Sequence, residues 1–200
     1  MTHAAKRLKR APRRLGLAAV AAVLLLVAGL WAARAARSGY IRWRVDRLAP
    51  LIDKHATACG VDPALVFAVV AAESGGDPRA KSGADARGLM QVTEITLAEV
   101  RDRRHAVGPG DLYDPDYGLQ VGCLYLASLL ERFHGDVAVS MAAYHMGPSA
   151  VAKWQSANPG AGAKKLLASP AVGPKTRAYV AGVMAGWAAR RADAGSRAKP

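Results

Sequence analysis

One carboxyl group, Glu73, occupies a position from which it could transfer protons. Asp62 and Pro63 are typical of the first residues of a helix, where a carboxylate caps free N–H groups and a missing N–H costs nothing. No helix-breaking residue follows until Gly75-Gly76. The spacing therefore predicts a short helix with Glu73 in its last turn.

The surroundings expected for Glu73 favour its protonated form. Val69, Val66 and Leu65 lie four, seven and eight residues earlier and share its face of the helix. Desolvation by these apolar neighbours and the negative end of the helix dipole both raise a carboxyl pKa. A carboxyl with a pKa near the working pH can act as a general acid and then as a base. The alternative is a half-exposed glutamate at a helix end without a chemical role.

Further motifs follow the glutamate in a fixed order. A polar loop over residues 77–87 leads to a short apolar motif and then to a helix predicted to begin near Thr93. The motifs that matter here are Glu73-Ser74, Ser82, Gly88-Leu89-Met90-Gln91 and Ala143-Tyr144. In this order and spacing they resemble the catalytic domain of soluble lytic transglycosylases, over about residues 49–188. The resemblance implies an all-α, lysozyme-like fold of the goose type and the glycan strands of peptidoglycan as substrate.

The resemblance also implies a mechanism with a single carboxylate. Glycosidases usually need two, whereas in this family one glutamate suffices, and Glu73 occupies its place. It protonates the oxygen between N-acetylmuramic acid and N-acetylglucosamine. The C6 hydroxyl of the sugar then attacks the anomeric carbon while the same carboxylate removes its proton, which gives a 1,6-anhydro end. Asp77 and Asp85 are candidates for a second carboxylate, although loop aspartates more often form turns. No cofactor is implied.

Several other positions match residues that surround the substrate in the family. The expected substrate-binding residues are Ser74, Ser82, Met90, Gln91, Tyr144, His145 and Tyr179. Met90 and Gln91 match positions that line the sugar cleft, and Tyr144 matches a tyrosine that positions the glutamate. Each has a structural alternative: a loop-to-helix junction for Gln91, turn chemistry for Ser82, and core packing for the tyrosines.

The sequence departs from the family pattern at three places. His145 stands where the family typically has Asn, Gly118 replaces another Asn, and Asp85-Ala86 stands where Gly-Ala is usual. We interpret His145 as a substituted structural or cleft residue and not as a new general base. Two alternatives to a lytic transglycosylase stay open: a hydrolytic muramidase of the same fold, and a catalytically impaired scaffold that binds peptidoglycan.

The net charge of +13 does not indicate a nucleic-acid binder. Residues 1–47 contain eleven Lys and Arg and one acid, whereas from Ala49 onward there are seventeen basic and fourteen acidic residues. The excess charge therefore flanks an apolar segment and is typical of membrane topology. The remainder is rich in Ala and lacks period-two patterns, which favours a helical domain.

The apolar segment predicts one transmembrane helix over residues 15–33. Its nineteen uncharged residues would span roughly 28 Å, close to the hydrocarbon thickness of a bilayer. An uncleaved signal anchor is favoured over a cleaved leader because the apolar run is long. Six basic residues in the tail, residues 1–14, place the N-terminus in the cytoplasm and the domain on the periplasmic side of the cytoplasmic membrane. Partners in an envelope machine are not identifiable from the sequence.

A juxtamembrane segment (34–48), a catalytic domain (49–190) and a disordered tail (191–200) complete the predicted organisation. An amphipathic helix is expected over residues 38–58, kinked or broken at Pro50. The other expected helices cover residues 94–104, 115–133, 137–145 and 150–155, with a last one beginning at Pro174.

The two cysteines and five histidines were considered as cross-links and ligands. Cys59 and Cys123 form either a disulfide or two small buried apolar groups. The histidines show no paired metal-ligand spacing, so no metal site is predicted.

Overall fold

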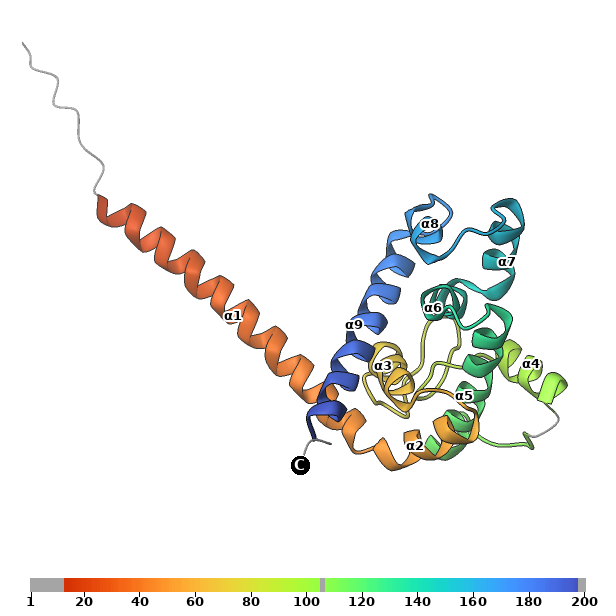
Figure 1. The fold of residues 1–200 in the computed structure, drawn as a ribbon. Helices are drawn as coiled ribbons and strands as arrows, with labels where there is room; N and C mark the ends of the chain where they lie inside the picture. Colours follow the sequence, from red (N-terminus) through yellow and green to blue (C-terminus); the bar gives the residue numbers. More distant parts are fainter. Residues whose placement is uncertain (1–12, 105–106, 198–200) are drawn as a thin grey trace, which may run out of the picture. The chain divides into compact units, whose positions relative to one another are not determined.

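The computed structural model describes residues 13–104 and 107–197, and within them the secondary structure is helical (Figure 1). No strand occurs in these ranges; two isolated bridges join Lys81 to Arg87 and Arg87 to Val92. The all-α prediction is thus confirmed. The helices are α1 Arg13–Asp46, α2 Ala49–Ala58, α3 Pro63–Glu73, α4 Glu94–Arg104, α5 Pro115–Arg132, α6 Val137–Met146, α7 Pro148–Ala157, α8 Ala163–Ala168 and α9 Pro174–Arg197.

The chain divides into two compact units, residues 1–40 and 41–200. The first unit contains most of α1. The stretch Ala19–Asp46 is long and apolar enough to cross a membrane, with a mean hydropathy of 2.0 over its most apolar window. Its apolar side chains, such as Leu25 and Trp31, are exposed. Length and composition therefore fit a membrane-spanning helix.

The helix expected over residues 38–58 is two helices. α1 continues to Asp46, and α2 begins at Ala49 with Pro50 in its first turn. Proline lacks an N–H and has a fixed φ, so it suits the start of a helix better than its interior. Pro50 thus opens the second helix and does not merely kink a longer one.

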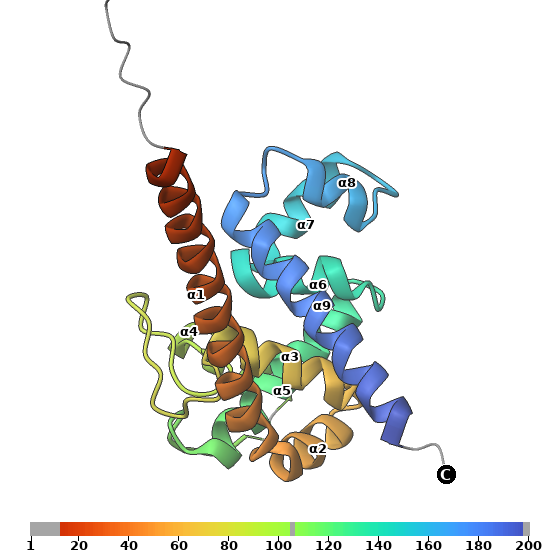
Figure 2. The same cartoon turned by 90° about the vertical axis from the view of Figure 1, so that its left-hand side faces the viewer.

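The second unit is built around α3, which packs between α2 and α9 (Figures 1 and 2). α6 packs on α9, α7 and α5, and α5 also contacts α2 and α4. Leu65, Val66 and Val69 of α3 are buried, as the helical spacing predicted. Met141 and Ala142 of α6 are buried as well. Two short apolar helices, α3 and α6, therefore form the centre of the domain. The last turn of α3 contains Glu73 and the last turn of α6 contains Tyr144.

The C-terminal helix is longer than expected. α9 extends to Arg197, so the disordered tail predicted from residue 191 is wrong for residues 191–197, and the rest of that tail lies outside the described residues. The Arg190 guanidinium donates to Asp46 at 2.6 Å and lies 4.1 Å from the centre of the Phe67 ring. Asp193 pairs with Arg42. These contacts are long-range, so a local pattern could not indicate them.

The region between α6 and α9 also contains more helix than the sequence indicated. α7 begins at Pro148, two residues before the predicted start, because proline is favoured at a first helical position. α8 was not predicted. It is six residues long, with Leu166 fully buried, and so short a helix gives only a weak periodic signal.

Candidate active site

Glu73 is the last residue of α3 and half-buried. The helix starts as the sequence predicted: Asp62 accepts a hydrogen bond from the Ala64 N–H at 2.8 Å, and Pro63 is the first helical residue. Burial raises the pKa of Glu73 from 4.5 to about 7, and the nearby Tyr179 hydroxyl opposes that rise. Desolvation is the larger effect, which agrees with the raised pKa expected from the apolar helix face.

Two tyrosines from different helices approach this carboxyl group. Tyr144 is near the end of α6 and Tyr179 is in the second turn of α9. Burial raises the pKa of each phenol, and the charge of Glu73 raises both further. The Tyr144 hydroxyl donates to the Met90 carbonyl oxygen at 2.7 Å. The Tyr179 hydroxyl is buried, makes no hydrogen bond to any described residue, and lies close enough to Glu73 to affect its pKa.

Ser74 joins the end of α3 to the loop that follows it. Its hydroxyl lies 2.9 Å from the Leu89 carbonyl oxygen and 3.2 Å from that of Val70, and it accepts from the Gly76 N–H at 3.1 Å. All three contacts are internal to the protein. Ser74 therefore fixes the position of Glu73 relative to the motif at residues 88–91.

Gln91 and Ser82 hold the same loop in shape. The Gln91 side-chain N–H₂ donates to the carbonyl oxygens of Ala80 and Gly88, both at 3.1 Å. The Ser82 hydroxyl accepts from the N–H groups of Ala84 and Ala86. The turn-forming alternative for Ser82 is therefore what the structure contains, and the Gln91 amide nitrogen is engaged with backbone.

Met90 does not line a cleft. Its side chain is fully buried and packs against Gly122 of α5, where an added Cβ would come within 2.7 Å of the Met90 Cβ. The expectation of a direct Met90 contact with sugar is thus corrected: this residue acts through packing and through the carbonyl that Tyr144 binds. Gly122 was missed in the sequence, because a glycine inside a helical pattern carries no signal of what packs on it.

Gly88 has a separate requirement. Its φ is +72°, and a Cβ there would overlap the carbonyl oxygen of Leu112. A glycine is needed both for the backbone conformation and for the close approach.

Gly118, the second departure from the family pattern, is in close contact with the same carbonyl. A Cβ at this buried position would lie 2.7 Å from the Leu112 oxygen. The local backbone of this chain therefore fits glycine and not a larger residue.

His145 bridges α6 and α9. Its Nδ1 lies 3.1 Å from the hydroxyl oxygen of the buried Thr176, and its ring is 4.7 Å from the ring of Tyr179. Its own side chain is exposed. Partial burial and, secondly, the charge of Lys175 lower its pKa. His145 thus touches a tyrosine that faces Glu73.

The two candidates for a second carboxylate are engaged elsewhere. Asp85 adopts a φ of +60° and pairs with Lys81 at 2.8 Å and Arg87 at 2.5 Å, and hydrogen bonds from these two cations lower the pKa of its carboxyl. Asp77 accepts from the Arg79 N–H and pairs with Arg44 at 3.3 Å. Both aspartates form turns, as their alternative reading held. Glu73 is the carboxyl that the two tyrosines face.

Cys59 and Cys123 are free thiols in this structure, so the disulfide that the sequence left open is not formed. Burial is the main reason that the pKa of Cys123 is raised. In residues 13–104 and 107–197 no group of three or more His, Cys, Asp and Glu side chains is placed to hold a metal ion.

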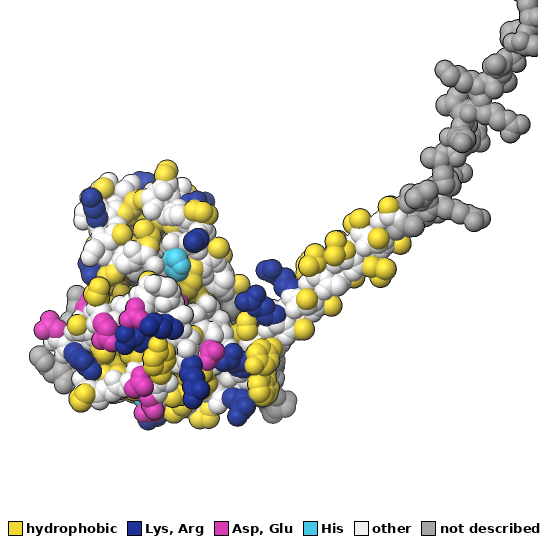
Figure 3. All heavy atoms as spheres, turned by 180° about the vertical axis from the view of Figure 1, so that it is seen from behind, with side chains coloured by type: hydrophobic (Ala, Val, Ile, Leu, Met, Phe, Trp, Pro, Cys, Tyr) yellow, Lys and Arg dark blue, Asp and Glu magenta, His cyan; other side chains and the backbone are white. Residues whose placement is uncertain are grey.

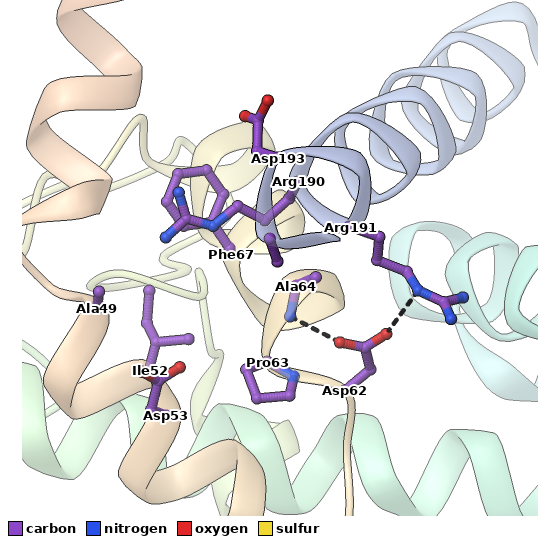
Figure 4. A pocket seen from close by; sticks show the side chains of 11 residues that line it. Ala49, Ile52, Asp53, Asp62, Pro63, Ala64, Phe67, Arg190, Arg191 and Asp193 are labelled. Carbon is purple, nitrogen blue, oxygen red and sulfur yellow. Dashed lines mark hydrogen bonds and ion pairs between the residues drawn. The ribbon is translucent and has the colours of Figure 1, made fainter. Parts of the chain in front are cut away.

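A cavity of about 550 Å³ lies at the other end of α3, away from Glu73 (Figure 4). Phe67, Pro63 and Ile52 form apolar walls, and Asp62 pairs with Arg191 at 3.8 Å on its rim. None of Glu73, Tyr144 and Tyr179 lines it. The cavity is therefore separate from the candidate site.

Comparison with known proteins gives a consistent result. The family model described as "Transglycosylase SLT domain" matches residues 50–167, more than half of the chain. A membrane-bound lytic murein transglycosylase C from Actinobacillus pleuropneumoniae is 32% identical over 127 residues, which cover 58% of this chain and 35% of that protein. The soluble lytic murein transglycosylase of Escherichia coli K12 is 28% identical over 138 residues, or 68% of this chain and 21% of that protein.

Solved structures agree with the sequence relatives. The 70 kDa soluble lytic transglycosylase from Escherichia coli superposes with a TM-score of 0.66 at 26% identity, over 73% of this chain and 24% of that one. The chain thus spans about a third or less of the length of these relatives. The predicted lysozyme-like fold is confirmed by this superposition.

Proposed function

Because the chain belongs to the transglycosylase SLT domain family, we propose that it is a peptidoglycan lytic transglycosylase with Glu73 as its general acid and base. The reaction cleaves the β-1,4 bond from N-acetylmuramic acid to N-acetylglucosamine and leaves a 1,6-anhydro end. One observation supports this above the others. A single carboxyl, with a pKa near 7, lies at the end of an apolar helix and interacts with two partly buried tyrosines.

The proposed reaction needs no second carboxylate. Protonated Glu73 donates its proton to the glycosidic oxygen as the bond from that oxygen to the anomeric carbon breaks. The C6 hydroxyl of the same muramic acid then forms a bond to the anomeric carbon, and its proton returns to Glu73. The carboxyl ends as it began and no water is consumed. A pKa of about 7 suits both halves, because the protonated and ionised forms are similarly populated near neutral pH.

The neighbours of Glu73 have distinct proposed roles. Tyr144, held by the Met90 carbonyl, fixes one wall of the site. The unpartnered hydroxyl of Tyr179 stabilises the carboxylate that forms after the first proton transfer. His145 and Tyr179 form the wall on the α9 side, where a sugar ring would lie. Ser74, Ser82 and Gln91 support the site through the loop and do not act on the substrate directly.

We further propose that residues 15–33 anchor the protein in the cytoplasmic membrane as a single-pass helix. Residues 1–14 would remain in the cytoplasm, and the domain over residues 49–190 would face the periplasm, where peptidoglycan lies. The apolar stretch in α1 supports this arrangement, as does the membrane-bound description of one relative. The basic tail before the helix supports the proposed orientation.

Digestion of purified sacculi tests the proposal. The full chain should release muropeptides with anhydro ends, identified by mass, and the Glu73→Gln variant should release about a thousandfold less, because the acid and the base are lost together. Products with reducing ends would identify a hydrolytic muramidase instead. Binding to sacculi without release of any product would identify a scaffold protein.

A further inference from the structure

Charge is divided unevenly within the helical domain. Residues 49–136 contain eight Lys and Arg against thirteen Asp and Glu, whereas residues 137–192 contain seven Lys and Arg and no acid. Five of these seven lie in the segment 148–178, which forms α7, α8 and the start of α9 and which we call the basic lobe. The members are Lys153, Lys164, Lys165, Lys175 and Arg177.

The lysines of the basic lobe lack the carboxylate partners that several cations elsewhere in the domain have. Lys54, Lys81 and Arg87 each pair with a carboxylate at 2.5–2.8 Å. The lysines of the basic lobe are exposed, and no carboxylate of the described residues pairs with them. The lobe containing α7 and α8 shows dark blue side chains and no magenta ones on the face in Figure 3. Its positive charge is therefore free to act on a ligand.

A shallow hollow lies within the basic lobe. It measures about 550 Å³ and is lined by Lys164 and Lys165 together with Gly162, Ala163 and Ala168. The Asp136 carboxylate lies 4.0 Å from the position that a Cβ of Gly162 would occupy, and it caps the start of α6 by accepting from the Val139 N–H at 3.0 Å. Two lysines thus border a space whose other walls are small apolar side chains.

The basic lobe is continuous with the site around Glu73. Lys175 lies near enough to His145 to lower its pKa, and His145 contacts Tyr179, which faces Glu73. Lys175 and Tyr179 are one turn apart on α9. His145 and Lys175 therefore lie between the site at Tyr179 and the rest of the basic lobe along the chain of contacts.

We propose that the basic lobe is a docking surface for the carboxylates of the peptides that are attached to the glycan strand. The proposal rests on the function proposed above and adds to it the part of the substrate that the lobe recognises. A strand held at Glu73 carries peptides with free carboxylates on its muramic acids, and the lobe offers exposed lysines that pair with no carboxylate of the described residues. A nucleic acid is disfavoured, because residues 49–136 carry five more acids than bases and would repel a long polyanion.

A binding assay on sacculi tests the proposal with the full chain in detergent. All proteins carry Glu73→Gln, so that sacculi stay intact and the binding result does not depend on the chemistry of cleavage. Lys164→Glu with Lys165→Glu should weaken binding at low salt by about tenfold, since each exposed charge contact contributes up to about 1 kcal/mol. The matched control, Arg79→Glu with Arg132→Glu, changes the net charge equally in the other half of the domain and should weaken binding less than about twofold.

The identity of the ligand is tested by converting the peptide carboxylates of the sacculi to neutral amides with a carbodiimide and ammonia. The amidated sacculi should bind the parent protein and the Lys164/Lys165 variant equally. Added salt should weaken binding of the parent to untreated sacculi and have little effect on its binding to amidated sacculi. Equal binding of parent and variant to untreated sacculi would overturn the proposal. So would a difference that persists on amidated sacculi, or a tighter, lysine-dependent binding to duplex DNA.

Discussion

The Tyr144 hydroxyl donates a 2.7 Å hydrogen bond to the carbonyl oxygen of Met90, and this bond ties α6 to the loop that follows Glu73. The Tyr144 ring also lies 5.3 Å from the ring of Tyr125 in α5. One side chain thereby joins its own helix, α6, to two other parts of the domain, the loop that follows Glu73 and α5. Its charge coupling to Glu73 shows that the same junction borders the candidate site.

Tyr144→Phe should therefore reduce both stability and activity. The substitution keeps the ring contacts and leaves the Met90 carbonyl without its donor, which costs about 1 kcal/mol of unfolding free energy. Loss of the fixed loop position should lower kcat about tenfold with a smaller change in KM, because misplacement of the acid affects the reacting geometry. Urea unfolding and release of products from sacculi measure the two effects. An unchanged kcat would show that the loop is held adequately by Ser74 and Gln91.

The stability of the protein should fall as pH rises, and Glu73 should be the cause. Below about pH 4.5 the carboxyl is protonated in the folded and unfolded chains alike, so its burial carries no charge penalty. Between that pH and the folded-state pKa of about 7 the unfolded chain ionises first, and stability is lost progressively. The expected loss is about 3 kcal/mol at pH 8, as an order of magnitude.

Comparison of Glu73→Gln with the parent isolates this effect. The variant should be more stable than the parent at pH 8 and of similar stability at pH 4, when urea unfolding is followed by fluorescence. Asp53→Asn removes an exposed carboxyl of α2 as a control and should change stability by less than about 0.5 kcal/mol at either pH. A Glu73→Gln variant that is destabilised at pH 8 would contradict the assignment of a buried, ionisable acid.

The contact between α5 and Met90 leads to a prediction on packing. Gly122→Ala places a methyl group within 2.7 Å of the Met90 Cβ, so the protein should lose about 1–3 kcal/mol of stability. Gly182→Ala in α9 is a matched control, because no atom lies within 4 Å of its added Cβ, and it should gain about 0.5–1 kcal/mol. Urea unfolding measures the free energy of unfolding of both variants. Similar free energies for the two would mean that the Met90 side chain moves aside at little cost.

Local signals explain why much of the fold was predictable. Asp62, Asp114 and Asp136 each cap the helix that the sequence assigned to them, since a capping side chain bonds to N–H groups two or three residues away. The apolar surroundings of Glu73 were predictable for the same reason. The residues four, seven and eight positions before it lie on the same face of the helix, and their types are read directly from the sequence. The end of α1 and the part of α9 from Arg190 onward make contacts with each other, Asp46 with Arg190 and Arg42 with Asp193, and such long-range contacts leave no local pattern.

The candidate site shows the same limit at the level of side chains. The motif at residues 88–91 located the loop correctly, yet its Met90 side chain turned inward onto Gly122 and its Gln91 amide bonded to backbone. A sequence motif therefore locates a site, but it does not tell residues that hold the site in shape from residues that contact a ligand. The unpartnered Tyr179 hydroxyl became evident only when α9 and α3 were seen together.

The departure at His145 gives the last prediction, on the pH dependence of activity. Its ring packs on Tyr179 at 4.7 Å and so holds that phenol toward Glu73, whose pKa the phenol lowers. The other titratable groups around this contact are Lys175 and Tyr144. Loss of the ring should release Tyr179, raise the pKa of Glu73 and move the alkaline limb of the pH–rate profile to higher pH.

Two variants separate the ring from its hydrogen bond. His145→Asn keeps a polar group near Thr176 and removes the ring, whereas His145→Phe keeps the ring and removes the bond to Thr176. The first should shift the alkaline limb upward by about half a pH unit, as expected when one weak polar contact with the carboxyl, worth under about 1 kcal/mol, is lost, and the second should leave it in place. Profiles of kcat/KM on sacculi between pH 5 and 9 supply the measurement. If Phe shifts the limb and Asn does not, then the bond to Thr176 positions Tyr179 and the ring contact does not.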